Sequence, residues 1–173
     1  MKNVVDRPVT ITVFKTKLGP MGVVESRDRL LLARIGSEDL PSLERVLFRN
    51  HAGAVVGSRS KVADLLIRYA KGEIIDFSEI LLDETVLSPF RRKVTEFARR
   101  IPYGKTSTYS ELAAQAGSPN AYRAAGSTMA NNPWTIVVPC HRVLAKGGIG
   151  GYSAPQGLDL KKHLLHLEAQ HVR

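Results

Sequence analysis

Hydrophobic and polar positions alternate at the start of the chain. Residues 9–14 (VTITVF) alternate apolar side chains with threonines and are mostly β-branched, which predicts a strand. Two more apolar segments, 22–26 and 30–33, flank the charged residues 27–29, and this arrangement predicts a hairpin that turns at the charges. We therefore expect a small antiparallel sheet in this part of the chain.

Helical periodicity replaces the alternation after the hairpin. Residues 43–48 are expected to be helical, and residues 60–70 show a clearer helix, with Ser60 as its cap and Gly72 as its stop. The apolar stripe of this second helix consists of Val62, Leu65, Leu66 and Tyr69. These elements predict a small α/β unit over residues 1–87, in which the sequence shows no catalytic constellation.

A second unit, residues 88–173, is predicted to be mainly helical. Ser-Pro at 88–89 starts a helix, because serine caps well and proline suits the first turn. The apolar stripe of this helix consists of Phe90, Val94, Phe97, Ala98 and Ile101. Residues 101–104 (IPYG) end it, and residues 158–169 form the last helix. Glu168 lies near the carboxyl end of that helix, where a negative charge opposes the helix dipole and suggests a specific partner.

Two short helices across a tight turn give this unit a helix-turn-helix pattern. Residues 108–111 (TYSE) fit a capping box at the start of the first helix, and residues 117–119 (GSP) turn the chain. Asn120 is expected to cap the second helix, which reaches about Ala130. The second helix is rich in small residues that allow close approach to a nucleic acid, and Arg123 projects from it as one long cation.

Composition is that of an ordinary globular protein, but the charge is unevenly distributed. Hydrophobic residues make up 43% of the chain, enough for a core. Residues 1–87 carry 13 basic and 12 acidic residues, whereas residues 88–173 carry 12 and 4, so most of the net charge of +9 lies in the second unit. A basic half favours a polyanionic partner such as nucleic acid, although surplus basic residues also aid solubility.

The apolar runs of the chain exclude two classes of protein. Residues 1–6 (MKNVVD) lack the apolar core of a secretory signal, and no run approaches the ~18 apolar residues of a membrane span. We therefore expect a cytoplasmic protein with no membrane partner, associated with the nucleoid if it is prokaryotic.

The single cysteine, Cys140, is the strongest candidate for chemistry. One thiol cannot form an internal disulfide and is too few for a cysteine-built zinc site. It follows Pro139 and precedes His141 and Arg142, where the histidine can relay a proton and the cations can favour a thiolate. A buried thiol that merely fills the core is the other interpretation. The glycine-rich residues 147–151 that follow are either a lid over the thiol or a plain connector.

Taken together, the motifs of the second unit resemble the O6-alkylguanine-DNA alkyltransferase family. The residues that carry the resemblance are Tyr109, Arg123, Asn132-Pro133, Pro139-Cys140-His141-Arg142-Val143, Tyr152-Ser153 and Glu168. The match runs from about Ser88 to Ala169 in the family's order, and the first unit matches only loosely. The resemblance implies a ribonuclease H-like first unit and a winged-helix-like second unit.

The resemblance also implies a role for each catalytic residue. Cys140 would accept the alkyl group, and His141 would take the thiol proton through a water. Glu168 would orient His141 and balance its charge. Asn132 would link the recognition helix to the active site, and Tyr109 would crowd the 3′ phosphate and help to rotate the nucleotide.

The implied partner is double-stranded DNA that contains O6-alkylguanine. The helix-turn-helix would bind the minor groove and flip the base into a pocket, while Arg123 would fill the vacated stack. The backbone carbonyls of Cys140 and Val143 would accept hydrogen bonds from the guanine amine. The pocket would be lined by Met129, Pro139, Val143, Tyr152 and Ser153, and further DNA contacts would come from Ala121, Ala124, Met129, Arg142 and Tyr109.

The chemistry implied in this way is stoichiometric. Transfer to a thiolate gives a stable thioether, so one protein would repair one guanine, with O4-alkylthymine as an additional substrate to test. No cofactor and no metal ion are needed, and we expect a monomer, with cooperative binding along DNA left open.

Some residues of this chain differ from the family pattern, and two other functions remain alternatives. Ala154-Pro155 stand where some relatives carry glycine, which would narrow the pocket, and Trp134 stands where smaller residues are common and has no role that the sequence explains. One alternative is a DNA-damage sensor or a helix-turn-helix regulator, although such sensors lack the cysteine. The other is a cysteine hydrolase that recruits a histidine from elsewhere, such as His163, His166 or His171.

Overall fold

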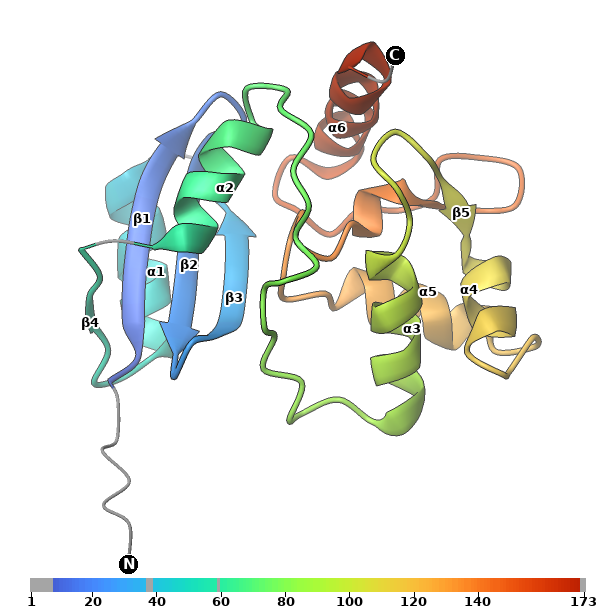
Figure 1. Ribbon diagram of the computed structural model, residues 1–173, viewed down its shortest axis with the longest axis horizontal. Coiled ribbons are helices and arrows are strands. Elements are labelled where there is room, and N and C mark those ends of the chain that lie inside the picture. The colour runs from blue at the N-terminus through green and yellow to red at the C-terminus, as the bar shows by residue number, and fades with distance from the viewer. Residues whose placement is uncertain (1–7, 37–38, 59, 172–173) are drawn as a thin grey trace, which may run out of the picture.

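The computed structural model describes residues 8–36, 39–58 and 60–171. The sheet and the helices that cover it form one side of the molecule, the helices of the second unit lie on the other side, and the last helix stands at the top (Figure 1). In chain order the elements are β1 (Thr10–Thr16), β2 (Gly19–Ser26), β3 (Arg29–Ile35), α1 (Leu40–Asn50), β4 (Val55–Val56), α2 (Lys61–Tyr69), α3 (Pro89–Arg99), β5 (Ser107–Thr108), α4 (Tyr109–Gln115), α5 (Tyr122–Ala130), the 3-10 turn η1 (Cys140–Arg142), β6 (Val143–Leu144) and α6 (Gly157–His171). None of the described helices combines the length and the apolar character needed to cross a bilayer.

The sheet of the first unit has the strand order β3-β2-β1-β4. The predicted hairpin is confirmed: β2 and β3 pair antiparallel around Arg27 and Asp28, whose φ angles of 52° and 65° suit a tight turn. The expectation of an antiparallel sheet was incomplete, because β4 pairs parallel to β1 and makes the sheet mixed. The reason is topological: α1 carries the chain back along the sheet after β3, so β4 starts at the same end as β1.

Helices cover both faces of this sheet, α2 in front and α1 behind (Figure 1). The predicted cap of α2 is confirmed, since the Ser60 hydroxyl accepts a hydrogen bond from the Ala63 amide at 3.0 Å. Gly72 follows with φ of 94°, and a Cβ there would lie 2.5 Å from the His171 ring. Glycine therefore ends α2 and lets α6 approach closely.

Two of the three side-chain caps predicted for helices of the second unit are confirmed. Ser88 caps α3, and Thr108 with Glu111 forms the predicted capping box of α4. Asn120 does not cap α5, contrary to expectation. The Ala121 amide donates to the Ser118 carbonyl at 2.8 Å, so the turn extends by one residue, and α5 begins after Ala121 without a side-chain cap.

One buried cluster continues through both units and includes residues of β2, α2, α3, α4 and the segment before Cys140. The outer edge of β3 is covered by that segment. The Ala33 amide donates to the Pro133 carbonyl at 2.9 Å, and the Thr135 amide donates to the Ala33 carbonyl at 3.0 Å. Trp134, unexplained by the sequence, is 1% exposed, and its indole N–H donates to the Leu30 carbonyl at 2.8 Å. The first unit therefore anchors the segment that leads to the cysteine.

Candidate active site

The turn between α5 and Cys140 holds Asn132 in a fixed orientation. Its Oδ1 accepts a hydrogen bond from the Trp134 amide at 3.0 Å. Its Nδ2 donates to the Val138 carbonyl at 2.9 Å and faces the Cys140 Sγ at 3.2 Å. Ile136 in the same turn has φ of 73°, a strained value for a β-branched residue that its burial stabilises. The anchored turn thus delivers an amide donor to the thiol.

Cys140 opens η1 and is 6% exposed. Burial raises the pKa of the thiol above its ordinary value, while the donor of Asn132, the charge of Lys161 and the phenol of Tyr152 act in the opposite direction. Desolvation outweighs these three, so the resting group is a protonated thiol. The neighbouring groups alone therefore do not ionise the thiol, and a base is needed to take its proton.

His141 and Glu168 form a buried pair behind the thiol. The His141 Nε2 lies 2.8 Å from the Glu168 Oε1, and the two side chains are 0% and 1% exposed. Since Nε2 donates to the carboxylate, Nδ1 of a neutral ring carries no proton. Nδ1 is buried and has no hydrogen-bond partner among the described residues. Burial lowers the pKa of His141, with Glu168 opposing, so the ring is neutral and able to accept a proton.

Glu168 owes its unfavourable position at the end of α6 to a set of buried donors. The Arg142 Nε donates to Oε2 at 2.9 Å, the Gly104 amide donates to Oε2 at 2.9 Å, and the Tyr69 hydroxyl donates to Oε1 at 2.6 Å. Burial alone would raise the pKa of Glu168, but the hydrogen bonds from His141 and Arg142 hold it far below its ordinary value. The carboxylate therefore stays charged.

Two residues that the resemblance places at the DNA, Arg142 and Met129, have buried side chains. Arg142 is 7% exposed, and its guanidinium is occupied by Glu168 and by the Ile101 carbonyl at 2.7 Å, so it faces the interior. Met129 is 3% exposed and packs in the core on the inner face of α5. The resemblance implied both contacts, whereas the helical turn of α5 and the 3-10 turn η1 point these two side chains inward.

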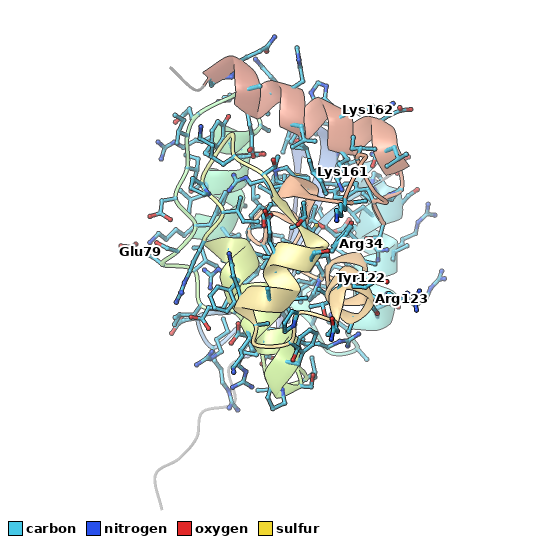
Figure 2. All side chains as sticks on the ribbon, turned by 90° about the vertical axis from the view of Figure 1, so that its right-hand side faces the viewer. Arg34, Glu79, Tyr122, Arg123, Lys161 and Lys162 are labelled. Carbon is cyan, nitrogen blue, oxygen red and sulfur yellow. The ribbon has the colours of Figure 1, made fainter. Side chains whose placement is uncertain are left out.

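Lys161 is a site residue that sequence reasoning missed. It is 0% exposed, and its Nζ donates to the Val143 carbonyl at 2.7 Å and to the Gly151 carbonyl at 3.1 Å. Lys162 points away from α6, while Lys161 lies on its inner side (Figure 2). Its charge lowers the pKa of Cys140. The available signal was spacing, because residues seven apart share a helix face and Lys161 precedes Glu168 by seven.

Two tyrosines lie beside the thiol. The Tyr152 hydroxyl is buried without a hydrogen-bond partner among the described residues, yet it is close enough to Cys140 to favour its ionised form. Tyr109 is half-buried at the start of α4, and a Cβ at Gly150 would lie 3.2 Å from its hydroxyl. Gly150, with φ of 73°, therefore lets the loop pack on Tyr109. Pro139 and Val143 are buried beside Cys140, whereas Ser153 is exposed.

α5 presents a surface of small side chains and one cation. Arg123 and Ala124 are exposed and Ala121 is partly exposed. Arg123 projects with Tyr122 from this helix (Figure 2), and its guanidinium carbon lies 5.7 Å from the centre of the Tyr122 ring. The cation is thus held against its own helix in this conformation.

No second histidine approaches the thiol in the described part of the chain. His163, His166 and His171 are exposed on α6, and the latter two bond within that helix. Nor do three histidine, cysteine, aspartate or glutamate side chains among the described residues gather closely enough to hold a metal ion. The geometry therefore offers a thiol with a neutral base and a buried cation.

Part of the chain matches a known protein family. Residues 89–170 match a family described as "6-O-methylguanine DNA methyltransferase, DNA binding domain". The chain is 47% identical over 104 residues to a methylated-DNA--protein-cysteine methyltransferase of Mycolicibacterium paratuberculosis. The aligned residues are 60% of this chain and 61% of that protein. The chain thus spans less than two thirds of that relative's length.

Two further matches cover nearly the whole chain. The constitutive methylated-DNA--protein-cysteine methyltransferase of Bacillus subtilis is 32% identical over 158 residues, which are 91% of this chain and 93% of that protein. The crystal structure of Mycobacterium tuberculosis OGT in complex with DNA matches with a TM-score of 0.78 at 31% identity and covers 95% of each chain. Both units of the molecule therefore have counterparts in these proteins.

Proposed function

The chain belongs to the methylated-DNA--protein-cysteine methyltransferase family, and from this membership we propose that it repairs DNA by moving an alkyl group from guanine O6 to Cys140 Sγ. The observation that carries the proposal is the buried thiol, held by Asn132 at 3.2 Å and followed by the buried His141–Glu168 pair.

The transfer is a displacement at the alkyl carbon. The Cys140 proton passes through a water to Nδ1 of His141, while Glu168 stabilises the resulting imidazolium. Sulfur bonds to the alkyl carbon, the bond from that carbon to O6 breaks, and its electron pair moves onto guanine. Guanine takes up one proton, which balances the one that the thiol gave up, and His141 returns to its neutral form. Lys161 and Asn132 stabilise the thiolate as it forms. The thioether is stable, so the protein acts once.

The substrate base must leave the duplex, because the thiol is buried and a stacked guanine cannot reach it. α5 would lie in the minor groove with its small exposed residues against the backbone. Arg123 would leave the Tyr122 ring and fill the gap in the stack, and Tyr109 would press on the adjacent phosphate. Val143, Tyr152 and Ser153 would surround the flipped base, with Pro139 behind it. We also propose that the second unit has a winged-helix-like fold and that the protein acts on O4-alkylthymine.

The test is mass spectrometry of the intact protein and of its peptides after incubation with duplex DNA that carries O6-methylguanine. We expect one added methyl group per protein, located on Cys140, with no further gain when substrate is in excess. Cys140→Ala should still bind the DNA and gain no mass. Binding without any methyl gain by the unaltered protein would instead identify a damage sensor.

A further inference from the structure

The Tyr69 hydroxyl reaches from the first unit into the buried pair of the second. The sequence places Tyr69 on the apolar stripe of α2, and the side chain is 0% exposed. Its hydroxyl donates to Glu168 Oε1 at 2.6 Å and lies 3.3 Å from His141 Nε2. The same carboxylate oxygen accepts from His141 at 2.8 Å. Tyr69 and His141 therefore share one oxygen of Glu168.

We propose that Tyr69 is a positioning residue for the transfer, through which the first unit keeps His141 neutral and ready to accept the thiol proton. The inference rests on the proposed function. A hydroxyl that donates to Oε1 withdraws part of the negative charge that this oxygen offers to His141. The carboxylate then orients the imidazole without binding a proton on it too tightly.

The other charged and titratable groups around the ring do not make Tyr69 redundant. Glu168 and Lys161 face His141 from α6, and Arg142 and Cys140 flank it in η1, while Tyr103 faces Glu168. Burial, Arg142 and Lys161 lower the pKa of His141, and Glu168 raises it. The Tyr69 hydroxyl contacts both His141 and Glu168. Among the described groups that do so, it is the one that comes from the first unit.

Removal of the hydroxyl should leave the carboxylate in place. Arg142 donates to both oxygens of Glu168: its Nε lies 3.2 Å from Oε1 and 2.9 Å from Oε2, and its Nη2 lies 2.9 Å from Oε1. The Gly104 amide also donates to Oε2. Tyr69→Phe therefore removes a donor without removing the anchor. Oε1 then attracts the imidazolium more strongly, so His141 stays protonated to higher pH.

Tyr103 offers a matched control. Its ring centre lies 6.0 Å from that of Tyr69, in the same aromatic cluster, and its hydroxyl is buried without a hydrogen-bond partner among the described residues. Tyr103→Phe deletes the same atom without deleting a hydrogen bond. It should therefore leave the pH dependence of the transfer unchanged.

The experiment measures the second-order rate of methyl transfer from an O6-methylguanine duplex to the full chain, as a function of pH. Tyr69→Phe is expected to shift the acid limb of the profile to higher pH, with a rate at its acid end about threefold or more below that of the unaltered protein. Tyr103→Phe should follow the unaltered profile. An unshifted profile for Tyr69→Phe, or a loss that is uniform over pH, would overturn the positioning role.

A second measurement needs no variant. Nuclear magnetic resonance of the unaltered protein should show a Tyr69 hydroxyl proton protected from exchange, with a cross-peak to the His141 ring, and its absence would also overturn the inference. If the unaltered protein transfers no methyl group, the proposed function fails. If it transfers the group and Tyr69→Phe behaves identically, this inference alone fails.

Discussion

A buried lysine beside a buried thiol is the least expected residue of the site. Cys140 lies in surroundings that favour its neutral form, and Lys161 supplies a positive charge that favours the thiolate. Burial lowers the pKa of Lys161, while Cys140 acts to raise it, so each group supports the charged form of the other. The lysine charge thus offsets part of the effect that burial has on the pKa of the thiol.

We expect Lys161→Met to slow methyl transfer near neutral pH. Loss of the charge raises the pKa of Cys140, so the difference from the unaltered protein should shrink as the pH rises and both thiols ionise. The variant should also unfold more easily, by about 1–3 kcal/mol, because the Val143 and Gly151 carbonyls lose their donor. Transfer rates across pH and denaturant titrations check both effects. Lys162→Met is the control, since that side chain is exposed and should change neither.

At the scale of elements, α5 joins the surface that we propose to face DNA to the turn that holds Asn132. Its exposed residues are small apart from Tyr122 and Arg123, whose stacked arrangement occupies no core space. The end of α5 leads directly into the turn whose amide faces the thiol. In the proposed function, the DNA-binding surface and the reacting thiol are therefore connected through this one helix.

Arg123→Ala should reduce transfer from duplex DNA far more than transfer from the free base O6-methylguanine. The residue is exposed and its removal opens no cavity, so thermal stability should change by no more than about 0.5 kcal/mol. Parallel rate measurements on the two substrates make the comparison. Equal losses on both substrates would remove Arg123 from the role of an intercalating side chain. Tyr122→Phe keeps the ring under the guanidinium and serves as the matched variant.

Trp134 connects the edge strand β3 to the cysteine turn. Trp134→Phe removes the donor to Leu30 and part of the buried volume, whereas Trp134→Ala removes nearly all of that volume. Since Phe/Trp→Ala changes in cores cost about 3–5 kcal/mol, we expect the alanine variant to be strongly destabilised and the phenylalanine variant to be intermediate. Urea titrations rank the three proteins. An alanine variant as stable as the native chain would show that the indole does not anchor the turn.

At the scale of the whole molecule, the sequence predicted local features better than contacts between distant segments. The hairpin around Arg27 and the capping box at Thr108 follow from short-range chemistry, and the structure confirms them. The burial of Arg142, the role of Trp134 and the reach of Tyr69 depend on segments tens of residues apart. A periodic pattern shows which face of a helix points inward, but it does not show which residues of distant segments pack against that face.

The buried His141–Glu168 pair leads us to expect a pH-dependent stability. Burial lowers the pKa of His141 below its ordinary value of 6.5, so the unfolded chain takes up the proton more readily than the folded one. The stability that neutral His141 contributes is complete well above pH 6.5 and is lost as the pH falls through that value. The pKa of Glu168 is lowered from 4.5, so its contribution is lost only at more acid pH. His141 therefore acts first.

We accordingly expect the free energy of unfolding to fall between about pH 7 and pH 5, as measured by urea titration at each pH. His141→Gln removes the titrating ring and should flatten this part of the curve, at the cost of a lower plateau because a buried partner of Glu168 changes. His163→Gln, on the exposed side of α6, should keep the native slope. If His141→Gln keeps the slope as well, the acid sensitivity arises elsewhere and the buried ring is not neutral at rest.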